Sequence, residues 1–217
     1  MCWLVRRIDE MTQHEMATTE LNHEMGGISG ARSGLRFTKG IGEMTATGQD
    51  RIEEFTGRPF VISRKFDAPR ERVWRAWTER ARLMQWFGPK GFKMPAAKID
   101  FRPGGTFHYC MEAPNGDEMW GKFVYREITA PERIVFVNSF SDEDGGLTRH
   151  PLSADWPLEM LSTITFAEQG GWTTVTVRWV PLNATDAERK TFEAGRGSME
   201  QGWSGTMDQL VDYLAKA

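Results

Sequence analysis

The sequence predicts an α+β fold in which a curved antiparallel sheet of about six to seven strands wraps around a long C-terminal helix. Two short helices are expected after the first strand. Apolar residues recur at helical spacing just after the first extended segment and again over residues 185–217. Between these regions lie six extended segments, separated by turn sequences such as RPGG, APNGD and QGG. Connections this short favour antiparallel neighbours over parallel crossovers.

The first strand and the first short helix are expected between residues 59 and 78. The segment PFVISRKF (59–66) is rich in β-branched and aromatic residues, which is typical of a strand. Asp67 is a candidate N-cap for the helix that follows. Val73, Ala76 and Trp77 recur at i, i+3 and i+4 and so predict the buried face of that helix.

The second short helix is expected to end where the sequence GP at 88–89 stops it. Thr78 is its candidate cap, and Leu83 and Trp86 repeat the helical spacing. Arginines occupy many of the intervening positions in both helices. We therefore expect the arginines to face outward and Trp77 and Trp86 to face inward.

The six extended segments that follow the short helices predict the rest of the sheet. They are 93–101, 105–113, 118–128, 133–140, 159–168 and 172–182. Alternation is clearest in the last segment, where Val175, Val177 and Trp179 share one face and polar residues share the other. This pattern predicts a sheet with one buried face and one face toward water.

The C-terminal region returns to helix. Thr185 and Glu188 form the T-x-x-E pattern of a capping box. The residues that then recur at helical steps are Phe192, Met199, Trp203, Met207, Leu210 and Leu214. Gly195 and Gly197 disfavour helix at their positions, so we expect a kink there.

Residues 1–57 have a different character from the rest of the chain. They show neither a helical nor an alternating apolar period, and they are rich in glycine. Such a segment buries too little apolar surface to offset its ordering entropy. We therefore expect a flexible tail at 1–57 and a single domain at 58–217. Met44 lies inside this tail and is the natural alternative translation start.

Charge and hydropathy argue against several classes of protein. The 27 basic and 30 acidic residues give a net charge of −3, which is atypical of a generic nucleic-acid binder or a polybasic membrane anchor. No apolar run approaches the roughly 20 residues of a membrane span. The first residues lack the apolar core of a signal peptide, and the two cysteines suggest no disulfide framework. We expect a cytoplasmic protein, monomeric or homodimeric, without nucleic-acid or membrane partners.

Four stretches carry a resemblance to a known family. RKFDAPRERVWRAWTERARLMQWFGP, PGGTF, WGKFVYREITAPERIVF and GWSGTMDQLVDYL occur in this order within residues 59–217. Together they resemble the SRPBCC superfamily, which has the START-like helix-grip fold. Within it, they are similar to the branch that includes the C-terminal domain of the heat-shock-protein-90 ATPase activator. Each motif alone is degenerate, whereas the ordered combination is specific.

The resemblance implies a cavity between the sheet and the long helix, which members of the superfamily often use to hold an apolar small molecule. We therefore expect a protein that binds a hydrophobic ligand, with no cofactor and no metal. The residues expected to line the cavity are Trp86, Phe107, Tyr109, Phe123, Tyr125, Phe136, Trp156, Phe166, Met199, Trp203 and Met207. Tyr109, Tyr125 and Asn138 are the polar candidates for orienting the ligand.

Two other functions stay open. The superfamily also includes polyketide cyclases, so a cyclase- or hydrolase-like enzyme could use the same cavity. That function needs an inward-facing acid or base, for which His108, Asp100 and Glu159 are candidates, although no catalytic constellation is identifiable. The resemblance also suggests a co-chaperone or protein-interaction module with a chaperone partner, although it covers only the helix-grip part of the larger eukaryotic activators.

His108, Cys110 and Glu112 share one face of a predicted strand. This arrangement could form a thiol–imidazole nucleophile or half of a metal site. Their more apolar neighbours occupy the other face, so we expect the histidine face to meet water, unless a bulge near 104–105 reverses the alternation. The acidic turn SDEDGG (141–146) lacks the spacing of an EF-hand calcium loop.

The segment LTRHPLSADWP (147–157) joins two predicted strands and is long for a connection. It is either a lid over the mouth of the cavity or an ordinary surface loop anchored by Trp156. The sequence favours neither alternative.

Overall fold

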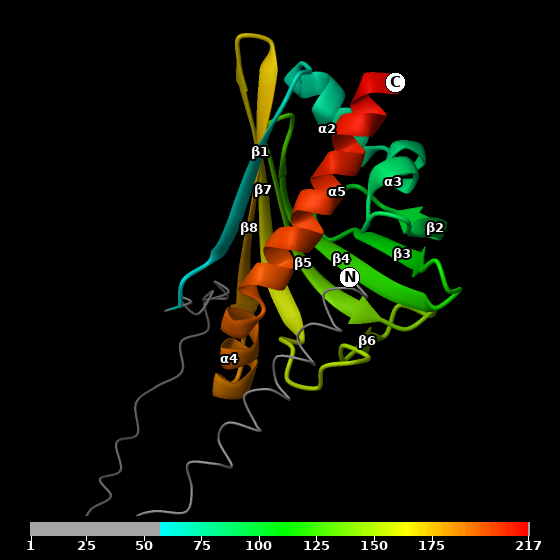
Figure 1. Ribbon diagram of the computed structural model, residues 1–217, viewed down its shortest axis with the longest axis vertical. Helices are drawn as coiled ribbons and strands as arrows, with labels where there is room; N and C mark the ends of the chain where they lie inside the picture. The colour runs from blue at the N-terminus through cyan, green and yellow to red at the C-terminus, as the bar shows by residue number, and fades with distance from the viewer. Residues whose placement is uncertain (1–56, 217) are drawn as a thin grey trace, which may run out of the picture.

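The computed structural model describes residues 57–216 of the 217-residue chain (Figure 1). Residues 1–56 of the predicted N-terminal tail, and with them the alternative start at Met44, lie outside the described residues. Within them, the order is one strand, two short helices, seven strands and two C-terminal helices.

The predicted extended segments all form strands, with bounds within two residues of those expected. The strands are β1 (Phe60–Phe66), β2 (Lys93–Ile99), β3 (Thr106–Glu112), β4 (Glu118–Thr129), β5 (Arg133–Ser141), β6 (Leu147–Thr148), β7 (Glu159–Gln169) and β8 (Trp172–Leu182). The helices are α2 (Arg70–Thr78), α3 (Arg80–Trp86), α4 (Asp186–Ala194) and α5 (Arg196–Lys216). The two-residue β6 lies at the start of the 147–157 segment.

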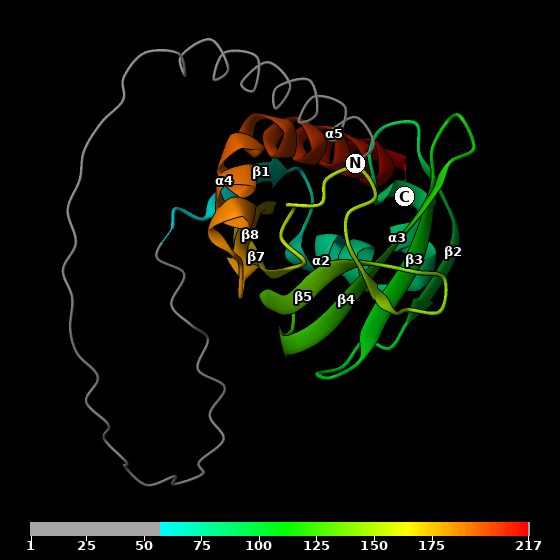
Figure 2. The ribbon, with the colours of Figure 1, turned by 90° about the horizontal axis from the view of Figure 1, so that it is seen from below.

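Seven strands form one antiparallel sheet in the order β1-β8-β7-β5-β4-β3-β2, and β6 pairs with the end of β5. The sheet curves around α5, which crosses its concave side, while α2 and α3 close one end (Figures 1 and 2). The α+β class, the curved antiparallel sheet, the two short helices and the long C-terminal helix are all confirmed.

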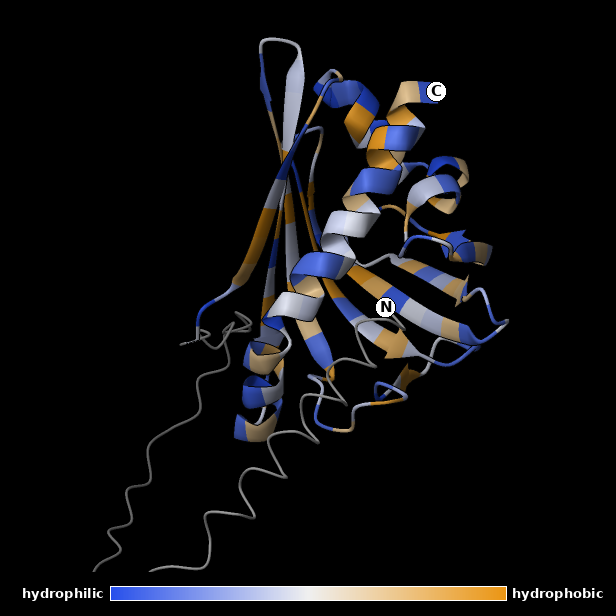
Figure 3. Ribbon diagram, viewed as in Figure 1, coloured by the Kyte–Doolittle hydropathy of each residue, from blue (hydrophilic) through white to orange (hydrophobic). Residues whose placement is uncertain are grey.

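Alternating side chains divide the sheet into two faces, as the sequence predicts. On β8, Val175 and Val177 are fully buried toward the helix, whereas Arg178 is exposed. The same alternation appears as bands of apolar and polar residues along the strands in Figure 3. The concave face and α5 therefore enclose the core between them.

The start of α2 differs from the prediction. Asp67 makes no cap, because the helix begins only at Arg70, after Pro69 in an extended conformation with ψ 148°. Instead, the backbone N–H of Arg70 donates to the Glu168 carboxylate from β7 at 2.8 Å. The helix N-terminus is therefore satisfied by a neighbouring strand rather than by the preceding residue.

Thr78 is not the cap of α3. Its hydroxyl donates to the Trp74 carbonyl oxygen of its own helix at 3.0 Å, and Glu79 occupies the N-cap position without a side-chain cap bond. The prediction for the tryptophans is correct, because Trp77 and Trp86 are both buried. The Trp86 indole nitrogen donates to the Ala76 carbonyl oxygen of α2 at 3.0 Å and so ties the two helices together.

The C-terminal region is helical with a break at Gly195, whereas Gly197, the other glycine at the expected kink, lies inside α5. Thr185 and Glu188 form a complete capping box at the start of α4. Gly195 is the C-cap of α4, and α5 begins at the next residue. The helical residues expected to recur on one face of α5, from Met199 to Leu214, are buried against the sheet and the short helices.

Candidate functional site

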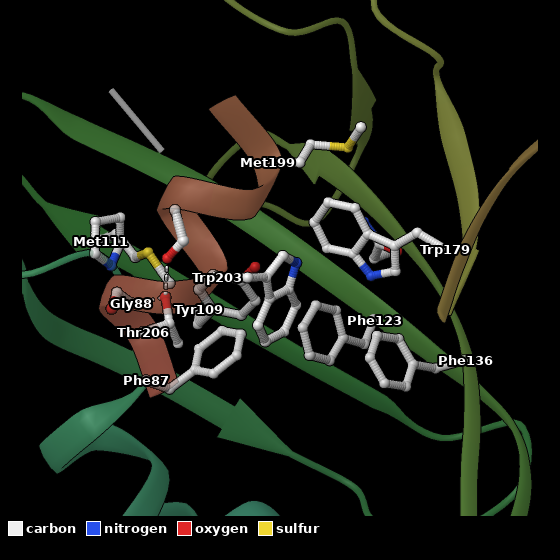
Figure 4. A pocket seen from close by; sticks show the side chains of 13 residues that line it. Phe87, Gly88, Tyr109, Met111, Phe123, Phe136, Trp179, Met199, Trp203 and Thr206 are labelled. Atoms are coloured by element: carbon white, nitrogen blue, oxygen red, sulfur yellow. Dashed lines mark hydrogen bonds between the residues drawn. The ribbon is translucent and has the colours of Figure 1, made fainter. Parts of the chain in front are cut away.

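A cavity of about 60 Å³ lies between the concave face of the sheet and α5 (Figure 4). Its lining residues are Phe87, Gly88, Pro89, Tyr109, Met111, Phe123, Phe136, Asn138, Trp179, Met199, Gly202, Trp203 and Thr206. Aromatic and methionine side chains make up most of this set, and it contains no charged side chain. Such a composition is typical of sites for apolar small molecules.

Strand alternation brings the sheet residues of the cavity to the same face. Tyr109 and Met111 are two residues apart on β3, and Phe136 and Asn138 are two apart on β5. Phe123 lies between these strands on β4, where its ring stacks on Phe136 with centroids 4.1 Å apart. The period of two that buries the sheet therefore also builds one wall of the cavity.

Trp203 on α5 forms the facing wall. Its ring stacks on Trp77 with centroids 6.2 Å apart and an angle of 13° between the planes. It also meets the ring of Trp179 edge-to-face at 5.4 Å. Trp203 thus packs against α2 on one side and the sheet on the other, while part of it borders the cavity (Figure 4).

The turn after α3 is fixed to α5 beside the cavity. Gly88 has φ 134°, a conformation that side chains rarely adopt. Its carbonyl oxygen accepts hydrogen bonds from the Thr206 hydroxyl at 3.1 Å and from the Gln209 side-chain amide. A β-carbon at this position would also lie 3.3 Å from the end of Met111. These contacts hold Phe87 and Pro89 at the edge of the cavity.

Two polar side chains on the sheet border the cavity. Asn138 is 6% exposed, and its carbonyl oxygen accepts a hydrogen bond from the buried Ser162 hydroxyl at 2.5 Å. Tyr109 is 5% exposed, and burial raises the pKa of its hydroxyl above the ordinary value. The tyrosine is therefore a protonated, uncharged hydroxyl at neutral pH.

A second, smaller cavity of about 10 Å³ adjoins the same two residues. It is lined by Tyr109, Met119, Trp120, Gly121, Asn138, Ser139, Phe140, Trp156, Pro157 and Met160. Because Tyr109 and Asn138 line both cavities, they form a partition between them. This second lining set also lacks charged side chains.

The 147–157 segment covers the second cavity and is anchored at several points. Thr148 pairs with β5, and the rings of His150 and Trp156 are buried, with His150 4.5 Å from the Phe140 ring. Arg149 pairs with Glu188 at the start of α4. These contacts support the description of the segment as an anchored surface loop, and its position over a cavity is compatible with the lid alternative.

Glu188 links this loop to the capping box. Burial raises the pKa of its carboxyl, but hydrogen bonds from Arg149 and Thr185 outweigh that effect, and the net pKa is lowered. The carboxylate is therefore charged at neutral pH and serves two structural partners. It lies in neither cavity lining.

His108 lies on the face of β3 that points away from α5. It stacks on Trp120 with ring centroids 4.8 Å apart, and its Nε2 lies 3.1 Å from the Asp142 carbonyl oxygen. It borders an outer surface groove together with Lys98 and Arg80. The cavity wall on β3 is made instead by the alternate residues.

Cys110 departs from the expectation for its face. We expected this side of β3 to meet water, but Cys110 is only 1% exposed. Cys110 is buried because it lies between Ala96 of β2 and Trp120 of β4, its partners on the two neighbouring strands of the sheet. Burial, together with the nearby charge of Glu118, raises the pKa of the Cys110 thiol to about 11. The thiol is therefore protonated at neutral pH and is not an activated nucleophile.

The predicted cavity residues divide into three groups. Five of them line the main cavity: Tyr109, Phe123, Phe136, Met199 and Trp203. Trp156 lines the second cavity. The remaining five are buried in the surrounding core without lining either cavity: Trp86, Phe107, Tyr125, Phe166 and Met207.

Several lining residues were missing from the predicted set. Met111 and Trp179 have the same parity as residues that were predicted to face inward, so alternation alone could have identified them. Phe87, Gly88 and Thr206 reach the cavity through the turn after α3 and its bonds to α5. No local sequence pattern reports that contact.

The acid–base candidates do not lie at the cavity. Asp100, His108 and Glu159 are absent from both lining sets. Among residues 57–216, no group of three or more histidine, cysteine, aspartate or glutamate side chains is arranged to hold a metal ion. None of the helices in the same range combines the length and apolar character needed to cross a membrane.

Comparison with known proteins gives the relatives of this chain. A family model described as Activator of Hsp90 ATPase homolog 1-like protein matches residues 67–215. A search of curated proteins found no match.

Solved structures from several bacteria are similar to this chain. A protein from Nitrosomonas europaea is 25% identical over 73% of this chain and 94% of its own, with a TM-score of 0.58. One from Staphylococcus epidermidis is 26% identical over 76% of this chain and 94% of its own, with a TM-score of 0.55. The AHSA1 protein from Silicibacter pomeroyi is 19% identical over 73% of this chain and 98% of its own, with a TM-score of 0.54, and so shows a shared fold.

Proposed function

This chain belongs to the family of Activator of Hsp90 ATPase homolog 1-like proteins, within the SRPBCC superfamily, and on that basis we propose that it binds a hydrophobic small molecule between its sheet and α5. The main observation in support is the uncharged, aromatic-lined cavity on the concave side of the sheet. We place this binding activity in the cytoplasm. Burial of apolar ligand surface contributes about 25 cal/mol of favourable binding free energy per Å².

The size of the cavity sets a condition on binding. Its volume of about 60 Å³ is smaller than the roughly 150 Å³ of an engineered apolar cavity that holds benzene. A ligand with one aromatic ring therefore requires the lining to move. Met111 and Met199 are the side chains best suited to this, because methionine is unbranched and changes rotamer easily. We infer that the cavity widens at these two residues when it is filled.

The enzyme alternative has less support. A cyclase or hydrolase needs an acid or base at the reacting atoms. The groups nearest to that role in the cavity are the Tyr109 hydroxyl and the neutral amide of Asn138. Because burial raises the pKa of the Tyr109 hydroxyl, it stays protonated at neutral pH and cannot act as a base. A binding function needs neither group to change its protonation state.

A co-chaperone function is the second proposal, and the family description is the observation that favours it. It predicts a stable complex with a chaperone ATPase and a change in the ATPase rate. Stoichiometric co-purification with such a chaperone would support it, and an unchanged ATPase rate at saturating protein would exclude activation.

The binding function is tested first on the protein as isolated. Native mass spectrometry should detect a retained small molecule if the ligand is available in the producing cell. Independently, titration with acetophenone and with ethylbenzene, followed by the indole N–H signals in ¹H–¹⁵N NMR spectra, should give saturable shifts with at least one of them. If no small molecule is retained and neither probe causes saturable shifts, the proposal is wrong.

A pair of glycines on α5 provides a matched variant test. Gly202 lines the cavity, whereas a β-carbon at Gly205 would meet nothing within 4 Å. We expect Gly202→Leu to fill the cavity and weaken probe binding by about tenfold, a loss of about 1.4 kcal/mol. Gly205→Leu makes the same change on the same helix and should leave binding unchanged. Equal effects of the two variants would contradict the proposed location.

A further inference from the structure

We propose that the cavity selects uncharged molecules that carry a hydrogen-bond acceptor, such as a ketone, ester or quinone oxygen, and that Asn138 and Tyr109 bind this acceptor. The inference rests on the proposed ligand-binding function and adds the chemical class of the ligand. It follows from the polar groups that border the cavity and from the charges that are missing there.

Asn138 supplies the first unused donor. It occupies an inward-facing position of β5 between Phe136 and Phe140, where an apolar residue would pack at lower cost. Its side-chain oxygen is already used by the Ser162 hydroxyl at 2.5 Å. The two amide protons lie on the other branch of the side chain, and Asn138 borders both cavities. They are therefore placed to donate to a bound molecule.

Tyr109 supplies the second donor beside the first. Its hydroxyl lies directly over Gly121, since a β-carbon built there would be 2.6 Å from the hydroxyl oxygen. Burial raises the pKa of this hydroxyl, which keeps its proton in place. Tyr109 borders both cavities, as Asn138 does.

Trp179 adds a third donor to the same wall. Its indole nitrogen is buried and has no hydrogen-bond partner among the described residues. Trp179 itself lines the main cavity. A buried donor without a partner is costly, and a ligand acceptor can relieve that cost.

The acceptors on the cavity wall are mostly used within the protein. The Gly88 carbonyl oxygen already accepts from Thr206 and Gln209. The single Thr206 hydroxyl proton is shared between the Gly88 and Gly202 carbonyl oxygens, at 3.1 and 2.9 Å, so Thr206 offers a ligand only an acceptor, through its lone pairs. The unused donors of Asn138, Tyr109 and Trp179 therefore outnumber the acceptors that remain free, and they match an acceptor on the ligand.

The absence of charge in both lining sets decides between neutral and anionic acceptors. A carboxylate moved into this site would lose its hydration without meeting a cation, which is a large cost. A ketone or ester oxygen accepts the same hydrogen bonds with a much smaller desolvation cost. The site therefore favours the neutral group.

Three probes of similar size separate these requirements: acetophenone, ethylbenzene and benzoate. We expect acetophenone to bind about tenfold more tightly than ethylbenzene, because ethylbenzene leaves the donors unpaired. Benzoate should bind more weakly than acetophenone by at least about tenfold. Equal binding of acetophenone and ethylbenzene would overturn the inference while leaving the apolar binding function intact. If neither binds, the proposed function itself fails, and tighter binding of benzoate would exclude selection for a neutral ligand.

Two tyrosines give a matched pair of variants for the same titrations. Tyr109→Phe removes the hydroxyl and keeps the ring, so the affinity for acetophenone should fall about three- to tenfold while that for ethylbenzene is unchanged. Tyr125 is also buried with a raised pKa but lines neither cavity, so Tyr125→Phe should change neither affinity. Asn138→Leu should act like Tyr109→Phe. If that variant does not fold, the tyrosine pair and the wild-type probe series still decide the question.

Discussion

Tyr109 lies on Gly121 of the neighbouring strand so closely that a β-carbon at Gly121 would fall 2.6 Å from the tyrosine hydroxyl oxygen and 2.7 Å from the ring carbon that carries it. The two residues are directly opposite each other in the β3–β4 register. Only glycine at position 121 lets the tyrosine ring lie flat across β4 and reach the partition between the two cavities. The position of the proposed ligand-binding hydroxyl therefore depends on a residue that itself carries no side chain.

Gly121→Ala should displace the Tyr109 ring. The added methyl group cannot be accommodated at 2.6 Å, so the ring must tilt away from β4. We expect a loss of about 1–3 kcal/mol in the free energy of unfolding, measured with urea, and weaker acetophenone binding. Gly197→Ala is the control, because it adds a methyl group where nothing lies within 4 Å. Gly116→Ala is less suitable as a control, because Gly116 has φ 87°, a conformation that residues with a side chain rarely adopt. Unchanged acetophenone binding in Gly121→Ala would contradict the role given to Tyr109.

Trp203→Ala should destabilise the protein and enlarge the cavity. A fully buried tryptophan typically contributes about 3–5 kcal/mol relative to alanine. Trp203 packs against Trp77 and Trp179 but also borders the cavity, so part of its surface has no packing partner. We therefore expect the low end of that range, about 3 kcal/mol, by urea unfolding.

Trp172→Ala is the comparison for that measurement. Trp172 is 39% exposed at the β7–β8 hairpin, where Lys65 lies 4.6 Å from its ring. Its loss should cost less than about 1 kcal/mol. If the two variants lose similar stability, Trp203 is not the packed wall described above.

The fold could be predicted from sequence because its determinants are local. The capping box of Thr185 and Glu188 spans four residues, and Gly195 marks the helix break without reference to any other segment. Strand alternation likewise needs only neighbouring residues, as in Val175 and Val177. The helix starts were less predictable, because the first N–H of α2 is satisfied by Glu168, almost one hundred residues away in the chain.

The candidate site could be predicted only in part, because strand alternation predicts which face of the sheet a side chain lies on but not how deeply that side chain is buried. Phe107 and Tyr109 have the same parity on β3, yet Phe107 is packed into the core and Tyr109 borders the cavity. Cys110 has the outward parity and is nevertheless buried between neighbouring strands. A cavity is the space that side chains from distant segments leave unfilled, and no single segment encodes it.

His150 should make stability depend on pH in the mildly acidic range. Burial lowers the pKa of its imidazole from 6.5 to about 4. Its Nδ1 accepts a hydrogen bond from the Leu152 backbone N–H at 3.0 Å, and protonation of that nitrogen would remove the acceptor. The unfolded chain binds the proton more tightly than the folded protein does. The stabilisation that the neutral His150 imidazole provides is therefore complete above about pH 6.5 and is lost progressively as the pH falls toward 4.

The expected slope is about 1 kcal/mol per pH unit between those limits for the wild type. His150→Asn keeps an acceptor in a similar place but cannot be protonated, so the difference between wild type and variant should carry this slope. Urea unfolding at half-unit pH steps measures this slope. The effect of carboxylate titration is the same in both proteins and cancels in the difference. Parallel curves for the two proteins would show that His150 does not titrate between the folded and unfolded states.

His108→Ala separates the binding function from the enzyme alternative. The β3–β4 register runs from Thr106 to Glu112 without a shift, so no bulge in that pairing turns the imidazole toward α5. The ring instead stacks on Trp120 at the outer face and contacts the Asp142 carbonyl oxygen. Loss of these partly exposed contacts should cost at most about 1 kcal/mol. Because the imidazole lies on the face opposite the cavity, acetophenone affinity should stay within about twofold of wild type, which is less than about 0.5 kcal/mol. A large loss of binding with little loss of stability would mean that His108 acts at the cavity, and the case for acid–base chemistry there would then be reopened.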